Sequence, residues 1–146
     1  MAVKTDTVFL GAARPIFAPY QGFHMLLSII IPIYNEANTL DKLIERVLAV
    51  DLGDIGKELV LVDDGSTDGT RDLLKKYENQ PGFRVILHKK NGGKGRAVRT
   101  GLQNSSGDFI IIQDADLEYD PNDYKRLLAP ILDGKADVVY GSRFKG

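Results

Sequence analysis

The feature that most limits how this chain can fold is its repeated alternation of short apolar runs with segments of helical periodicity. The run Leu27–Ile33 is almost continuously apolar, which is typical of a strand buried on both faces of a sheet. Apolar residues then recur at helical spacing from Leu40 to Leu48, which predicts a helix with one buried face. The same pattern predicts further strands over residues 58–62, 84–87, 108–112 and 137–140.

More helices are predicted between these strands, over residues 68–77 and 94–104 and from Pro121 onward. Leu102 is expected to face inward from the second of them. Asp120 and Pro121 form a favoured pair at a helix start, and Pro130 is expected to kink or end that helix near residues 126–129. Strands that alternate with helices in this way indicate an α/β fold, in which a mainly parallel sheet is covered by helices on both faces.

Length and composition fit one globular domain and exclude several classes of function. The chain has 146 residues, of which 43% are hydrophobic and 27% are charged. Its net charge of −1 gives no general attraction to nucleic acid, and the lack of cysteine excludes disulfides and thiolate chemistry. No segment approaches the roughly 18 consecutive apolar residues that a transmembrane helix needs.

Residues 1–24 differ from the rest of the sequence because they show neither a helical nor a strand period. They also lack the basic, apolar and small-residue order of a secretory signal. We therefore expect a disordered leader, or one added for expression, that contributes little to stability, and a functional domain over residues 25–146. The alternative is a docking arm whose aromatic side chains contact a partner, namely Phe9, Phe17, Tyr20 and Phe23.

Polar clusters follow the predicted strands, at the point where each strand ends. They are Tyr34–Glu36, Asp63–Gly69, Lys89–Gly95 and Asp114–Glu118. The carboxyl ends of parallel strands share one edge of a sheet, and open α/β sheets bind ligands in the crevice at that edge. Each cluster alone fits a solvated turn, but their convergence favours a nucleotide site.

The acidic pair Asp114 and Asp116 adds a metal to this expectation. Two residues at i and i+2 of extended backbone project to the same side, so both carboxylates can face one cation. Mg²⁺ is commonly held by one or two carboxylates together with phosphate oxygens of a substrate. A basic stretch over residues 84–99 and an acidic stretch over residues 108–123 also suit an anion that is bound partly through a metal.

Other nucleotide and catalytic motifs do not fit the sequence. The turn after the first core strand contains no glycine, which excludes the G-x-G-x-x-G dinucleotide motif. The P-loop pattern fails because His88 stands where its first glycine is required, and Gly95 stands where Ser or Thr is required. His24 and His88 show no metal-ligand spacing or triad arrangement, and we interpret His88 as a strand-end residue rather than a base.

Five segments together resemble the family 2 glycosyltransferases, and within them the dolichol-phosphate mannosyltransferase and polyprenyl-phosphate glycosyltransferase branch. They are Ser28–Glu36, Val62–Thr70, Asn91–Gly101, Asp114–Glu118 and Gly141–Arg143, within residues 27–144. The resemblance implies a GT-A (Rossmann-like) fold and an inverting transfer from a nucleotide-diphosphate sugar. The chain ends before further elements of that family's catalytic domain, so we expect a domain truncated at its C-terminus.

The resemblance also implies roles for single residues on the donor side. The turn that holds nucleobase and ribose corresponds to Pro32, Tyr34 and Glu36. Asp63 corresponds to the residue that reads the base edge, whereas Asp64 is interpreted as ordering the Asp-Gly turn. Lys94 corresponds to a residue near the donor phosphates.

The remaining implied roles concern the metal and the acceptor. The resemblance implies Mg²⁺ or Mn²⁺, with Asp116 as the principal ligand, Asp114 beside it or near the ribose, and Glu118 as a further ligand. Ser142 and Arg143 resemble the pair that meets the phosphate of a lipid acceptor, and the alternative for both is a solvated turn after a strand. Asp116 and Arg143 are thus the expected catalytic residues.

The expected reaction is transfer of a sugar from a GDP- or UDP-sugar to a polyprenyl or dolichyl phosphate, at the cytoplasmic face of a membrane. A phosphate acceptor is already anionic near neutral pH and needs positioning more than deprotonation, and no general base is evident. Three alternatives stay open: a nucleotide-sugar-binding module without turnover, a family 2 transferase with a hydroxyl acceptor, and a nucleotidyltransferase. The last of these lacks a Gly-rich triphosphate loop after the first core strand.

Overall fold

The computed structural model describes residues 5–10, 25–117 and 120–142. Within these ranges the chain forms a six-stranded sheet with the order β4-β3-β2-β5-β1-β6. The strands are β1 (Thr5–Leu10), β2 (Met25–Ile33), β3 (Ile55–Asp63), β4 (Phe83–Leu87), β5 (Phe109–Ile112) and β6 (Val138–Ser142). The α-helices are α1 (Leu40–Ala49), α2 (Thr70–Leu74), α3 (Lys94–Gln103) and α4 (Tyr124–Leu132), and short 3-10 turns cover Lys75–Tyr77 and Pro121–Asp123.

The centre of the sheet is parallel. Strand β2 pairs in parallel with both β3 and β5, and β3 pairs in parallel with β4. The four strands therefore end at one common edge, and the turns that follow them lie there, as the sequence predicts. Strand β1 is antiparallel to both of its neighbours, β5 and β6, so the whole sheet is mixed but mainly parallel.

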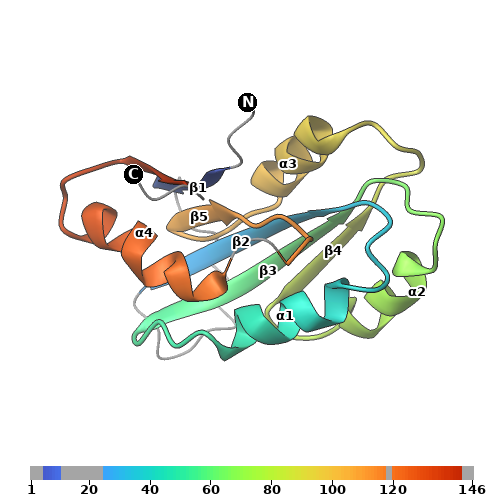
Figure 1. Ribbon diagram of the computed structural model, residues 1–146, viewed down its shortest axis with the longest axis horizontal. Coiled ribbons are helices and arrows are strands. Elements are labelled where there is room, and N and C mark those ends of the chain that lie inside the picture. Colours follow the sequence, from blue (N-terminus) through green and yellow to red (C-terminus); the bar gives the residue numbers. More distant parts are fainter. Residues whose placement is uncertain (1–4, 11–24, 118–119, 143–146) are drawn as a thin grey trace.

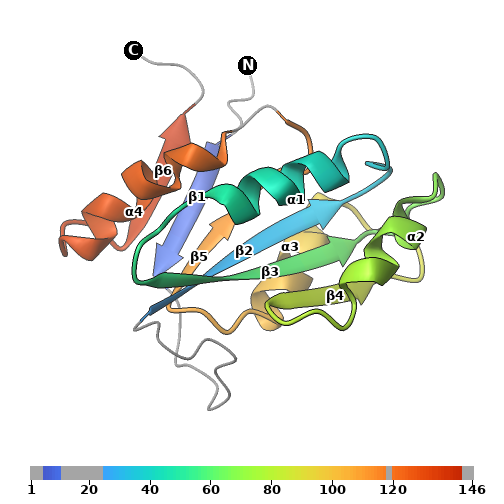
Figure 2. The same cartoon turned by 90° about the horizontal axis from the view of Figure 1, so that it is seen from below.

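Helices cover both faces of this sheet. Helix α3 lies on one face, and α1, α2 and α4 lie on the other (Figures 1 and 2). The alternation of side chains along β2 divides the core accordingly: Ile30 packs with Ala97 of α3, whereas Ile29 and Ile31 belong to the cluster on the opposite face. Because both faces are buried, the strands need the nearly continuous apolar runs seen in the sequence.

Two details of the helices differ from the sequence prediction. Leu102 is 40% exposed, and the contact of α3 with the sheet is made by Gly101, where an added Cβ would lie 2.3 Å from Ile30 Cγ2. A helix that packs this closely turns its small residue inward. Helix α4 passes through Pro130 and ends at Leu132, so the proline lies within its last turn rather than ending the helix near residues 126–129.

Strand β1 also differs from prediction, because residues 1–24 were expected to lack regular structure. Thr5–Leu10 instead pairs with β5 on one side and β6 on the other, with Val8 opposite both Ile111 and Val139. These partners lie about a hundred positions or more along the chain, so no local period in the leader reports the pairing. The rest of the predicted leader, residues 1–4 and 11–24, lies outside the described residues.

Candidate functional site

A pocket of about 400 Å³ opens at the carboxyl edge of the parallel strands. The turns after β2, β3, β4 and β5 all contribute to its wall. Most residues predicted for the donor side line this pocket: Pro32, Tyr34, Glu36, Lys94, Asp114 and Asp116. Asp64 lines it as well, and Asp63 does not. The structure thus brings together, around one cavity, side chains that are up to 84 positions apart in the sequence.

The turns after β2 and β3 are joined by reciprocal hydrogen bonds. The Asn35 backbone N–H donates to Ser66 Oγ over 2.9 Å, and the Thr67 N–H donates to Asn35 Oδ1 over 2.8 Å. Asn35 has a φ of 52°, a left-handed conformation that asparagine tolerates better than most residues. The Glu36 N–H donates to Thr70 Oγ1 over 3.1 Å, so these cross-links fix the wall that presents Tyr34 and Glu36.

Asp63 is fully buried and organises its own turn. Its Oδ2 atom accepts hydrogen bonds from the N–H groups of Gly65 and Ser66, each over 3.1 Å, and from Arg71 Nε over 2.8 Å. Its Oδ1 atom is buried and has no hydrogen-bond partner within the described ranges. The turn-ordering role that the sequence suggested for Asp64 is thus met by contacts of Asp63.

Asp64 links this turn to the loop after β4. Its carboxylate accepts from the N–H groups of Gly92 and Gly93, at 3.0 and 2.7 Å, and its Oδ1 lies 2.8 Å from His88 Nδ1. Burial alone would raise the pKa of Asp64, but the hydrogen bonds from His88 and the two glycines lower it overall. Asp64 is therefore held ionised at the wall of the pocket.

Lys94 and Asp114 form an ion pair at the wall of the pocket. Lys94 is the first residue of α3, and Asp114 follows β5, so the pair joins two of the converging turns. The Lys94 side chain is 58% exposed and that of Asp114 is 13% exposed, which leaves the ammonium accessible from the pocket. This pair provides both charges that a diphosphate and a cation need.

The metal prediction fits the oxygen donors of the pocket. Asp114 and Asp116 line the same cavity, and Thr39 Oγ1 holds the segment between them by donating to the Ala115 carbonyl over 3.2 Å. Across residues 5–10, 25–117 and 120–142, no group of three or more His, Cys, Asp or Glu side chains could hold a metal alone. Two carboxylates that are completed by diphosphate oxygens suit Mg²⁺ or Mn²⁺.

Three predicted residues remain untested by this geometry. Glu118 and Arg143 lie outside the described residues. Ser142 is the last residue of β6 and stands opposite Thr5 of β1.

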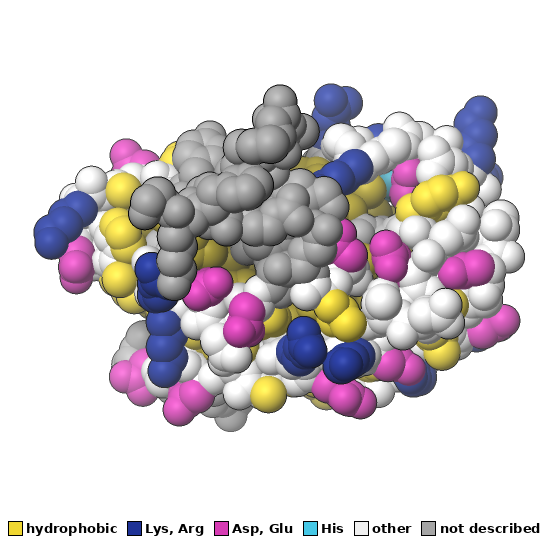
Figure 3. Space-filling view, viewed as in Figure 1, with side chains coloured by type: hydrophobic (Ala, Val, Ile, Leu, Met, Phe, Trp, Pro, Cys, Tyr) yellow, Lys and Arg dark blue, Asp and Glu magenta, His cyan; other side chains and the backbone are white. Residues whose placement is uncertain are grey.

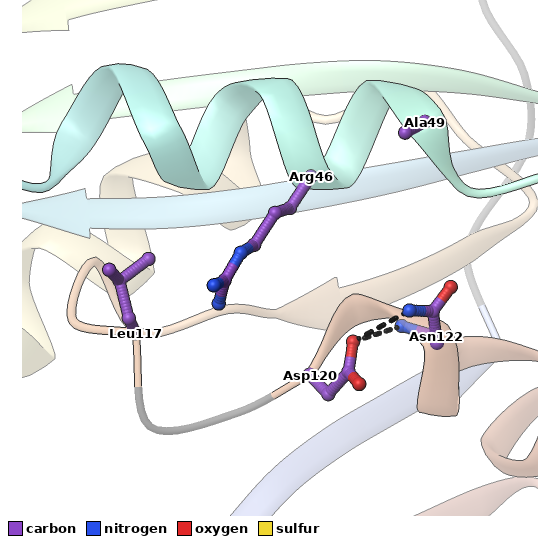
Figure 4. A pocket seen from close by; sticks show the side chains of 5 residues that line it. All are labelled: Arg46, Ala49, Leu117, Asp120 and Asn122. Carbon is purple, nitrogen blue, oxygen red and sulfur yellow. Dashed lines mark hydrogen bonds between the residues drawn. The ribbon is translucent and has the colours of Figure 1, made fainter.

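A second cavity of about 400 Å³ lies between α1 and the segment that leads into α4 (Figure 4). Arg46 points from α1 toward this segment, and Asp120 accepts hydrogen bonds from the backbone and side chain of Asn122 over 3.0 Å each. Asp120 is thus a local cap, as the sequence predicts. Residues 118 and 119, which stand between Leu117 and Asp120 in the sequence, lie outside the described ranges.

The charges on this face are separated as the sequence suggests. Lys and Arg side chains stand out at the top of the space-filling view, over α3 and the loop before it (Figure 3). Acidic side chains lie below them, across the middle of the same face. Lys94 from the basic stretch and Asp114 from the acidic stretch meet at the pocket.

Sequence reasoning missed two residues that organise the site. The sequence places His88 at the end of a strand, but its imidazole contacts both Asp64 and Thr100 Oγ1. No motif in the sequence includes Arg71, yet it contacts Asp63 and donates through Nη2 to the His88 carbonyl. Neither residue belongs to a spaced motif, and only their positions next to the converging turns could have drawn attention to them.

Comparison with known proteins identifies the family. A sequence profile described as Glycosyl transferase family 2 matches residues 28–146. This chain belongs to that family. The resemblance seen in the motifs is thereby confirmed, and the α/β fold with its mainly parallel sheet agrees with the GT-A type that the resemblance implies.

Individual relatives agree with this family 2 assignment. The chain is 39% identical over 117 residues to an undecaprenyl-phosphate 4-deoxy-4-formamido-L-arabinose transferase from Edwardsiella ictaluri. The match covers 77% of this chain and 35% of that relative, so the chain spans about a third of the relative's length. In the described part of the chain, no helix has the length and apolar character that a bilayer crossing requires.

Several solved structures resemble this fold. TarS 1-349 from S. aureus, in complex with UDP-GlcNAc, has a TM-score of 0.63 and 30% identity, over 75% of this chain and 32% of that one. The mannosyltransferase PcManGT from Pyrobaculum calidifontis, in complex with GDP-Man and Mn²⁺, has a TM-score of 0.55 and 27% identity. That match covers 74% of this chain and 30% of the mannosyltransferase.

Proposed function

We propose that the protein transfers a sugar from a UDP- or GDP-sugar to a polyprenyl phosphate, with inversion and with the help of Mg²⁺ or Mn²⁺. The observation that supports this most directly is the pocket at the carboxyl edge of the sheet. It presents Asp64, Lys94, Asp114 and Asp116 from three separate turns around one cavity. Asp64 offers a hydrogen-bond acceptor for a nucleobase, and Lys94 offers a positive charge for phosphate. Asp114 and Asp116 offer carboxylate oxygens for a metal ion.

On the donor side, Asp64 is the better placed of the two neighbouring aspartates to read the base. It lines the pocket, whereas Asp63 is occupied by its own turn and by Arg71. A carboxylate has roughly four acceptor positions, and in Asp64 three donors contact them: His88, Gly93 and the Gly92 N–H, which is shared between both oxygens. A base edge with an N–H donor would take the position that Gly92 shares. Uracil and guanine have such an N–H, whereas adenine and cytosine present an acceptor at the corresponding atom.

On the phosphate side, Lys94 would exchange its contact with Asp114 for a contact with the donor diphosphate. Asp114 would then be free to join Asp116 in holding the metal, with Glu118 as a further ligand. A divalent ion held there acts as a Lewis acid that stabilises the negative charge on the leaving diphosphate. Pro32, Tyr34 and Glu36 would hold the base and ribose from the opposite wall.

The acceptor side rests on the resemblance and on the relatives. The name of the Edwardsiella ictaluri relative specifies undecaprenyl phosphate, and a phosphate nucleophile needs positioning rather than a general base. Ser142 and Arg143 are our candidates for that phosphate, because an arginine can bind it through two parallel hydrogen bonds. The cytoplasmic membrane face, where such an acceptor would be presented, is the proposed location.

The test uses labelled UDP- and GDP-sugars with undecaprenyl phosphate and Mn²⁺, and resolves the lipid products by chromatography. The proposal expects a labelled, lipid-soluble product from one of the two nucleotide classes. Titration calorimetry with UDP and GDP is run in parallel on the same protein. Binding without product would support a nucleotide-sugar-binding module, and neither binding nor product would overturn the proposal.

A further inference from the structure

His88 occupies a junction between the two turns that form the base side of the pocket. Its backbone N–H donates to the Asp63 carbonyl over 2.8 Å, and its own carbonyl accepts from Arg71. The imidazole is 7% exposed and contacts two different elements: Asp64 after β3 and Thr100 within α3. A buried histidine with polar contacts at both ring nitrogens is held in one orientation.

The contacts of the ring define which nitrogen bears the proton in the neutral form. An ionised carboxylate can only accept, so the hydrogen between His88 Nδ1 and Asp64 Oδ1 belongs to the imidazole. In neutral imidazole the other nitrogen is then an acceptor, and the Thr100 hydroxyl donates to Nε2 over 2.9 Å. This assignment follows from the network, in which a single tautomer satisfies both contacts.

The Asp64 carboxylate connects His88 to the loop before α3. With its orientation fixed by His88, it accepts from the N–H groups of Gly92 and Gly93, the two residues directly before Lys94. The two turns also touch directly, because a Cβ at Gly65 would lie 2.5 Å from the Asn91 nitrogen. The position of Lys94 in the pocket therefore depends on a chain of contacts from α3 through His88 and Asp64 back to the loop.

We propose that His88 is a positioning residue for nucleotide binding, which acts by orienting the Asp64 carboxylate through Nδ1. It does not contact the pocket itself, and both of its ring nitrogens are engaged, so it is not a general base. The proposal rests on the function proposed above, in which Asp64 meets the base and Lys94 meets the diphosphate. Its local consequence, the ordering of the loop over residues 91–93, does not depend on any ligand.

Two substitutions separate the two ring contacts. The side-chain amide of asparagine is as many bonds from Cα as Nδ1, so His88→Asn can keep the bond to Asp64 while losing Thr100. The amide of glutamine is as far from Cα as Nε2, so His88→Gln can keep Thr100 while losing Asp64. Thr100→Val is the matched control, because it removes the Nε2 contact and leaves His88 in place.

The ligand-independent readout is amide hydrogen exchange of Gly92 and Gly93, measured by NMR. We expect slow exchange in the wild type, in His88→Asn and in Thr100→Val, and exchange at least about tenfold faster in His88→Gln, because a bond to a charged acceptor is lost. UDP and GDP affinities with Mn²⁺ should follow the same order, with a loss of about tenfold in His88→Gln only.

The outcomes distinguish this inference from the proposed function. Equal exchange and equal affinity in His88→Asn and His88→Gln would overturn it, since the ring would then act only by filling space. Faster exchange in His88→Gln alone, in a protein that binds neither nucleotide, would support the positioning of the loop and overturn the proposed function. Thermal melting of each variant checks that the fold is retained. If His88→Gln does not fold, His88→Asn still tests the inference, because fast exchange of Gly92 and Gly93 in that variant would overturn it.

Discussion

Lys94 and Asp114 show how single charges prepare the pocket for a charged ligand. Each neutralises the other, so neither is left as an isolated charge at a partly buried site. In the proposed function, a diphosphate that arrives with a divalent ion would offer both side chains a replacement partner, phosphate for Lys94 and metal for Asp114. The exchange of partners needs little rearrangement, because both side chains already lie at the wall of the same cavity.

Asp116 is the residue on which the metal assignment depends most. Asp116→Asn keeps the shape of the side chain but removes its negative charge, so Mn²⁺-dependent UDP or GDP binding should fall by about tenfold or more. Calorimetry with and without Mn²⁺ measures this effect, and Asp123→Asn, on an exposed acidic residue after the same segment, is the control. Unchanged metal dependence in Asp116→Asn would contradict the assignment.

Asp64 should also appear in the pH dependence of stability. Its pKa is lowered in the folded protein, because hydrogen bonds from His88, Gly92 and Gly93 outweigh the effect of burial, which alone would raise it. The ionised carboxylate therefore stabilises the fold above its unfolded pKa of about 3.9, and this stability is lost as pH falls through the lower folded pKa.

The predicted result is that Asp64→Asn destabilises the protein near neutral pH and loses less stability than the wild type upon acidification. Urea unfolding at a series of pH values between about 2 and 7 measures both curves. Asp54→Asn, at an exposed position, is the control and should follow the wild type. Parallel curves for Asp64→Asn and the wild type would contradict the contacts described for Asp64.

Among the elements, helix α1 has its C-terminal carbonyls bound by a residue from a different element. Lys57 of β3 donates from Nζ to the carbonyls of Val47, Leu48 and Val50, at 3.0, 2.8 and 2.5 Å. The last carbonyls of a helix lack partners within it and attract a positive charge. Lys57 thus fixes the end of α1 to the start of β3.

Lys57→Met should lower the free energy of unfolding by about 1–3 kcal/mol, because the carbonyls at the end of α1 lose their donor. Chemical denaturation measures the change, and Lys42→Met on the exposed side of α1 should have little effect. If both variants lost the same small amount, the contact would contribute nothing specific to stability.

The elements also show what the sequence can and cannot predict. Strands β2 to β5 and helix α1 were predictable, because buried strands leave nearly continuous apolar runs and the buried face of a helix leaves a helical period. The inward contact of Gly101 was not, since close packing of α3 on Ile30 requires the absence of a side chain at a position that looks polar by pattern. The acidic turns could be predicted because they directly follow apolar strands in the sequence. The separate roles of Asp63, Asp64 and His88 could not, because they depend on contacts between residues that are distant in the sequence.

At the scale of the whole molecule, β1 joins two strands that otherwise do not pair. Strands β5 and β6 run in the same direction and are separated by β1, which is antiparallel to both. Within the described ranges, β6 has no other neighbour in the sheet. The family profile matches from residue 28, so this strand lies outside the part of the chain that the profile covers.

Thr7→Pro tests this arrangement through the backbone alone. Thr7 stands opposite Tyr140 of β6, one residue before the pairing of β1 with β5 begins at Val8, and proline is poorly tolerated inside a paired strand. We expect a loss of more than about 2 kcal/mol, with faster amide exchange in Val138–Ser142, and a change within about 0.5 kcal/mol for Thr7→Val. A negligible effect of Thr7→Pro would restore the original expectation that the first residues are dispensable.

The pairing of β1 sets an order of events during synthesis. Strands β2, β3 and β4 find their neighbours among nearby residues, so this half of the sheet can assemble while the ribosome is still translating the rest. Strand β1 precedes these strands in the chain but pairs with β5 and β6, whose last paired residue is Ser142. Until β5 and β6 have been synthesised, Thr5–Leu10 has no native strand to pair with, so this segment is open to wrong strand pairing during that interval.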